Sequence, residues 1–129
     1  MPLTKIEVCK RWSPEQVQTI IEAVYLAQRE ALKVPEGDRQ IRFVEHCPEH
    51  FHIPAGKSGN YTVVEINIFL GRSIEAKRAL YKAIVRNLGR VGIDPSDILI
   101  VLHEIPLENW GIQGGVLASE VDLGFKVNV

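Results

Sequence analysis

Residues 62–75 read TVVEINIFLGRSIE, and this short stretch joins a strand to a helix. The β-branched and aromatic residues of positions 62–70 are typical of a strand. Gly71-Arg72-Ser73 supplies a turn, and Ser73 is a favourable N-cap residue with Glu75 in the first turn that follows. The sequence therefore predicts a strand over 62–70 and a helix that begins after Ser73.

The rest of this half continues the pattern. The predicted helix ends at Gly92, Pro95-Ser96-Asp97 makes a turn, and residues 98–102 form an apolar run typical of a buried strand. This half therefore reads strand, helix, strand. The apolar stripe of the helix consists of Ala76, Leu80, Ala83, Ile84, Leu88 and Val91.

The first half of the chain has the same order of elements. Residues 3–9 suit a short strand, and Ser13-Pro14-Glu15 starts a helix that extends to about Lys33. Turn residues 35–38 end it, and residues 41–44 form a second strand. The helical stripe consists of Val17, Ile20, Ile21, Val24, Ala27, Ala31 and Leu32.

The two halves form an internal repeat, and residues 46–61 are a polar loop between them. We predict one α+β domain over residues 1–129, with half-repeats at about 2–48 and 61–106 and a tail at 107–129. Two βαβ units would build a four-stranded sheet with both helices on one face. The matched positions are Ser13 and Ser73, Glu15 and Glu75, Pro35 and Pro95, Asp38 and Asp97, and Pro48 and Pro106.

Such a sheet has one bare face, which chains of this size commonly cover with another subunit, so we expect a homo-oligomer. Apolar and polar residues alternate over 121–129, which predicts a strand at the end of the chain.

Composition excludes several classes of protein. The 129 residues are 46% hydrophobic, enough for one folded core, and 15 basic against 16 acidic residues give a net charge of -1. We expect no nucleic-acid or membrane partner, because the chain has neither a strong positive charge nor an apolar run long enough to span a bilayer. A cytoplasmic location is expected, in which Cys9 and Cys47 are free thiols.

Pro2 is the first candidate for chemistry. Removal of Met1 would leave its nitrogen as a secondary amine and therefore a base. An α-amino group has a pKa of about 7.7 to 8.0, and burial near cations lowers that pKa toward the range in which general bases work best. A Met-Pro start also occurs in proteins without any catalytic role, so Pro2 needs partners.

Three further features could supply such partners. Arg72 lies at a strand-to-helix turn, where its guanidinium and free helix N–H groups could bind a carboxylate, although the turn alone favours an ordinary solvated arginine. Asp38 lies in the equivalent region of the first half and could orient water or a proton, or serve as an ordinary turn residue. The block 108–115, ENWGIQGG, suits a pocket wall or a loop held by Trp110.

Other motifs are weaker. Residues 45–52, EHCPEHFH, match no standard zinc spacing, so we predict no metal site. His103-Glu104 is interpreted as structural. The chain has neither a phosphate-binding glycine loop nor a serine elbow.

Together these features resemble the tautomerase superfamily, within its fused, double-length group that includes malonate semialdehyde decarboxylase. The resemblance covers residues 2 to about 115. It rests on Met1-Pro2-Leu3 opening a strand, the tandem repeat, Gly71-Arg72-Ser73 with Lys77, Leu80 and Tyr81 after it, and Glu108-Asn109-Trp110-Gly111.

The resemblance implies a homotrimer that uses Pro2 as acid/base and needs no metal or organic cofactor. It implies that Arg72 binds a substrate carboxylate and that Asp38 positions water. Trp110 and Asn109 are the implied substrate-binding residues. The sequence departs from the decarboxylase pattern at Leu70, where that group carries the first of two arginines.

We therefore expect a keto-enol tautomerase of small 2-keto or enol acids. One alternative is a decarboxylase or hydratase of a 3-carbon acid, for which Asp38 would be essential. Another is a ferredoxin-like ligand-binding or assembly module without catalysis, since element order alone does not distinguish that fold.

Overall fold

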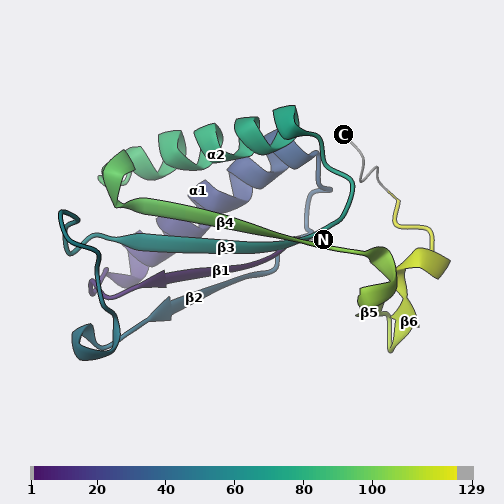
Figure 1. Ribbon diagram of the computed structural model, residues 1–129, viewed down its shortest axis with the longest axis horizontal. Helices are drawn as coiled ribbons and strands as arrows, with labels where there is room; N and C mark the ends of the chain where they lie inside the picture. Colours follow the sequence, from purple (N-terminus) through teal and green to yellow (C-terminus); the bar gives the residue numbers. More distant parts are fainter. Residues whose placement is uncertain (1, 125–129) are drawn as a thin grey trace.

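Two α-helices cover one face of a four-stranded β-sheet in the computed structural model, which describes residues 2–124 (Figure 1). This arrangement confirms the predicted α+β fold. In chain order the main elements are β1 (Pro2–Val8), α1 (Pro14–Leu32), β2 (Ile41–Glu45), β3 (Thr62–Phe69), α2 (Ile74–Gly89) and β4 (Ile98–Ile105).

The sheet has the strand order β2-β1-β3-β4. Each half contributes one parallel pair, and the two halves meet through the antiparallel pair of β1 and β3. β4 extends beyond the predicted 98–102, because His103 and Glu104 continue the ladder opposite Asn67 and Ile68. Their polar side chains are tolerated since β4 is an edge strand, which can expose polar residues.

The caps predicted for both helices are confirmed. The Ser13 hydroxyl accepts a hydrogen bond from the backbone N–H of Gln16, whose side chain accepts one from the N–H of Ser13, forming a capping box. The Ser73 hydroxyl accepts from the N–H of Ala76. The two caps fix where each helix starts relative to the strand before it.

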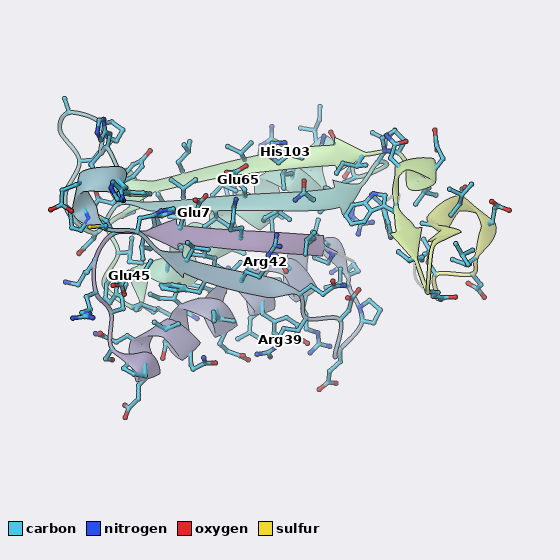
Figure 2. The ribbon with its side chains drawn as sticks, turned by 90° about the horizontal axis from the view of Figure 1, so that it is seen from below. Glu7, Arg39, Arg42, Glu45, Glu65 and His103 are labelled. Atoms are coloured by element: carbon cyan, nitrogen blue, oxygen red, sulfur yellow. The ribbon has the colours of Figure 1, made fainter. Side chains whose placement is uncertain are left out.

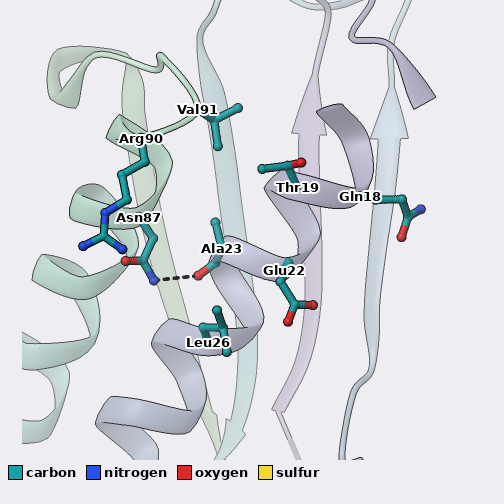
Figure 3. Close-up of a pocket in the computed structure, with 8 residues that line it drawn as sticks. All are labelled: Gln18, Thr19, Glu22, Ala23, Leu26, Asn87, Arg90 and Val91. Atoms are coloured by element: carbon teal, nitrogen blue, oxygen red, sulfur yellow. Dashed lines mark hydrogen bonds between the residues drawn. The ribbon is translucent and has the colours of Figure 1, made fainter. Parts of the chain in front are cut away.

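The core lies between the helices and the sheet and contains two buried polar contacts. Gln28 of α1 donates to the Thr4 hydroxyl of β1 at 2.5 Å. Asn87 of α2 donates to the carbonyl of Ala23 at 3.0 Å, at the base of an outer groove between the helices (Figure 3). Because a buried amide needs a partner, these bonds fix the position of each helix.

The tail differs from the prediction. Residues 121–124 form no strand, because the N–H of Gly124 is bonded to the Asp122 side chain and Gly124 has a left-handed φ of 74°. The remainder of the predicted strand, 125–129, lies outside the described residues. A small hairpin precedes this segment, with β5 (Gly111–Ile112) paired to β6 (Val116–Leu117).

Residues 2–124 leave the sheet face opposite the helices uncovered, and this face carries charged side chains, as Figure 2 shows. His103 contacts Glu65 at 2.9 Å across β4 and β3, and His46 contacts Glu7 at 2.8 Å. No helix within residues 2–124 is long and apolar enough to cross a membrane.

Candidate active site

One end of the sheet collects the residues that the sequence singled out. Pro2 at the start of β1 pairs with Ile68 near the end of β3, and Phe69 pairs with Ile105 at the end of β4. The starts of β1 and β2 and the ends of β3 and β4 therefore meet at the same end, from which the β5–β6 hairpin projects (Figure 1).

Pro2 is buried at the first position of β1. A proline is well suited to this position, since the first residue of a strand can lack a ladder donor. Burial alternates along β1, with Pro2 on the same side as the core residues Thr4, Ile6 and Val8. The nitrogen of Pro2 thus lies at the sheet end while its ring lies toward the helix layer.

Arg72 lies in the turn between β3 and α2 and is only 6% exposed. Gly71 before it has a φ of 131°, a conformation that favours glycine and allows the sharp change of direction. Burial lowers the pKa of Arg72 below the ordinary value of an arginine. An arginine still keeps its charge at neutral pH, so this end of the sheet contains a largely desolvated cation.

Asp38 approaches the same end from the first half of the repeat. Its backbone N–H donates to the carbonyl of Pro35 in the turn after α1, and the residue is half-buried. Two residues later, the carbonyl of Gln40 accepts from the N–H of Thr4 at 2.9 Å, which holds this segment beside the start of β1. The structure therefore places Asp38 at the end of the sheet where Pro2 and Arg72 also lie.

Trp110 forms a wall rather than a free lid. Its ring contacts Phe69 edge-on, with centroids 4.9 Å apart, and its Nε1 donates to the carbonyl of Ile105 at 3.2 Å. The same carbonyl accepts from the N–H of Leu70, so one oxygen ties the end of β3 to Trp110. Asn109 is exposed at the end of the 3-10 turn Leu107–Asn109.

The sequence did not predict a hollow of about 370 Å³ that is lined by chain neighbours of Arg72 and Asn109 and not by the candidate residues themselves. The sequence feature that could have indicated this hollow is Leu70, an apolar residue in a turn. In the structure Leu70 is 53% exposed. The lining consists of Leu70, Pro106, Leu107, Glu108 and Ser119.

The other titratable clusters are paired among themselves, and one of them, Lys77 with Glu104, lies near the same end of the sheet because Glu104 is opposite Ile68, the partner of Pro2. His46 stacks on Phe51 and contacts Glu7, while Cys47 donates to Glu49 and lowers the pKa of that carboxyl. His103 contacts Glu65 and not its neighbour Glu104, which binds Lys77 at 2.6 Å. These contacts pair the side chains with one another along the sheet.

The internal repeat places equivalents of the candidate site positions at the opposite end of the sheet, where the residues are different. Trp12, which precedes the cap Ser13 as Arg72 precedes Ser73, is 7% exposed. Asp97 is buried and accepts from both the N–H and the hydroxyl of Ser58, at 2.9 and 2.5 Å. The loop 46–61 is thereby tied to this end.

Sequence comparison relates the chain to known enzymes. A family model described as "Tautomerase enzyme" matches residues 38–113, more than half of the chain. The 2-hydroxymuconate tautomerase of Comamonas testosteroni is 38% identical over 58 residues, which span 44% of this chain and 90% of that relative. The relative thus corresponds to about one half of the repeat.

Solved structures agree over nearly the whole chain. FG41 malonate semialdehyde decarboxylase inhibited by 3-bromopropiolate has a TM-score of 0.81 at 28% identity, covering 89% of this chain and 92% of that chain. A fused 4-OT, a symmetric trimer, has a TM-score of 0.81 at 24% identity, covering 91% of this chain and 96% of that chain, and shows the fold alone. The resemblance drawn from the sequence is confirmed: this chain is an enzyme and belongs to the tautomerase family.

Proposed function

We propose that this enzyme interconverts keto and enol forms of small 2-keto acids, with the amino-terminal nitrogen of Pro2 as general base. The observation that carries the proposal is the placement of two buried residues, Pro2 and Arg72, at one end of the sheet. Proton abstraction from an anionic substrate is favoured where a base lies beside a cation that binds the substrate and stabilises the developing charge, and this end of the sheet offers both groups.

The reaction moves one proton between two atoms of the substrate, so the substrate and the product have the same composition. Once Met1 is removed, the neutral Pro2 nitrogen takes a proton from the substrate and becomes a cation. It then returns a proton at a different atom of the same substrate. Arg72 holds the carboxylate and stabilises the negative charge that develops on the enolate oxygen. Trp110 and Asn109 border the space in which the substrate lies.

The same proposal includes assembly into a homotrimer. The uncovered sheet face carries partly exposed side chains on all four strands, which a second copy of the chain would cover (Figure 2). A fused 4-OT with the same fold is a symmetric trimer, which supports this number of subunits.

Pro2→Ala tests the role of the ring nitrogen. Alanine keeps a terminal amine but loses the rigid ring that fixes the direction of the nitrogen lone pair. The rate should therefore fall by less than the full contribution of a general base. We expect kcat/KM for ketonisation of phenylenolpyruvate to fall by about 10- to 100-fold. Intact mass must show Met1 removed in both proteins. Equal rates would refute a role for the proline ring, and the role of the terminal nitrogen itself is tested by a form that retains Met1.

A decarboxylase or hydratase of a 3-carbon acid is the second candidate, favoured by the likeness to malonate semialdehyde decarboxylase and by the position of Asp38. In that reaction Pro2 acts as a cation and Asp38 positions water. Asp38→Asn, assayed on both phenylenolpyruvate and malonate semialdehyde, separates the two. If the enzyme is a tautomerase, ketonisation changes by less than about 10-fold. If it is a decarboxylase or hydratase, turnover of malonate semialdehyde falls by about 100-fold or more.

A further inference from the structure

Exposed apolar side chains gather at the active-site end of the sheet. Leu70 is 53% exposed and Ile74, at the first position of α2, is 66% exposed. Val116 and Leu117 of the β5–β6 hairpin are each 41% exposed. Single exposed apolar residues are ordinary, but several at one place mark a surface that binds something apolar.

The hollow beside the site begins at one of these residues. Leu70 lies two positions beyond Ile68, the partner of Pro2, which corresponds to about 7 Å along the strand. Pro106 and Leu107 form the facing wall. The volume of about 370 Å³ lies within the range of small-molecule sites, so the hollow can accept part of a substrate whose carboxylate is bound at Arg72.

The charge of the hollow selects against a second carboxylate. Glu108 lines it, and among its described lining residues there is no lysine or arginine. A substrate with carboxylates at both ends would place one of them against Leu70 and Glu108, where it loses water and meets a like charge. An aryl or alkyl group at the same place would instead gain apolar contact.

We propose that this site prefers acids with a single carboxylate and an apolar substituent over dicarboxylic acids. This inference takes one element from the proposed function, which is that Arg72 binds the first carboxylate. Leu70 and Glu108 are the specificity-determining residues, because the first contacts the substituent and the second repels an anion.

Equilibrium binding tests the preference without turnover. Isothermal titration compares two stable acids, 3-phenylpropanoate with one carboxylate and adipate with two. We expect 3-phenylpropanoate to bind about 10-fold or more tightly, in line with the apolar burial of a ring. Equal affinities, tighter binding of adipate, or no binding of either acid would overturn the inference.

Two variants test the residues named. Leu70→Arg adds a cation at the hollow, so the affinity ratio of 3-phenylpropanoate to adipate should fall by about 10- to 100-fold, as for a hydrogen bond to a charged group. Glu108→Gln removes the repulsion and should strengthen adipate binding by a few-fold, since Glu108 is exposed and solvent screens its charge.

Leu26→Arg is the matched control, because Leu26 is 46% exposed on α1 in the groove between the helices, away from this end. It should leave the ratio unchanged, and a ratio that falls as much in this control as in Leu70→Arg would refute the role of Leu70. A protein that prefers 3-phenylpropanoate but does not ketonise phenylenolpyruvate would contradict the proposed function and keep the binding preference. A protein that ketonises phenylenolpyruvate but binds adipate more tightly would refute the binding preference and leave the proposed function standing.

Discussion

A form of the protein that retains Met1 is expected to lose about 100- to 10,000-fold in kcat/KM for phenylenolpyruvate. A preceding residue converts the Pro2 nitrogen into an amide, whose lone pair is delocalised into the carbonyl and takes up no proton near neutral pH. The buried position of Pro2 at the start of β1 would be unchanged. The loss would therefore measure the basicity of one nitrogen.

Inserting a lysine between Met1 and Pro2 produces this form, because a large second residue prevents removal of methionine. Inserting a glycine instead allows Met1 to leave and still makes the Pro2 nitrogen an amide, without the bulk of methionine. Both proteins should be equally inactive, with the masses confirmed by mass spectrometry. An active glycine-insertion protein would show that bulk, and not basicity, explains the first result.

Arg72→Ala is expected to lower kcat/KM by about 100- to 1000-fold, the usual cost of removing one preorganised group that stabilises an oxyanion. The guanidinium is 6% exposed, so the charge interacts with a bound anion through little intervening water. Its pKa is lowered by burial, yet it remains protonated across the neutral range. Activity between pH 6 and 9 should therefore follow the titration of Pro2 rather than that of Arg72.

Two variants serve as controls for this result. Arg72→Lys keeps the charge but loses the planar pair of donors, so it should recover only part of the activity. Arg78→Ala removes an exposed arginine from α2 and should leave kcat/KM within a factor of about two. Thermal unfolding of all three proteins separates a loss of catalysis from a loss of folding, and Arg72→Ala with full activity would refute the assignment.

Much of the fold followed from local sequence. Ser13 and Ser73 identified both helix starts because an N-cap is a local interaction between residues three positions apart. The repeat then predicted one four-stranded sheet with both helices on one face, but the antiparallel pairing of β1 with β3 that joins the halves came from the structure. Pro2, Asp38, Arg72 and Trp110 were grouped by the family resemblance, and the structure's strand register shows that they lie toward one end of the sheet.

The parts that were missed depend on partners distant in sequence or on backbone conformation. The contact of Asp97 with Ser58 joins residues that no periodicity relates. The turn of the β5–β6 hairpin requires positive φ at Gln113, which is not a glycine. Residues 121–124 show the reverse case, in which an alternating pattern is outweighed by the bond between Asp122 and the N–H of Gly124.

Trp12 and Arg72 occupy equivalent places in the two halves, and this has an evolutionary consequence. In an assembly of identical half-length chains, each substitution would appear at both ends of every sheet. In one covalent chain the two positions can differ, and here one half carries the cation of Arg72 while the other carries the buried ring of Trp12. If the proposed function holds, separate mutations would change stability at the end with Trp12 and substrate range at the end with Arg72.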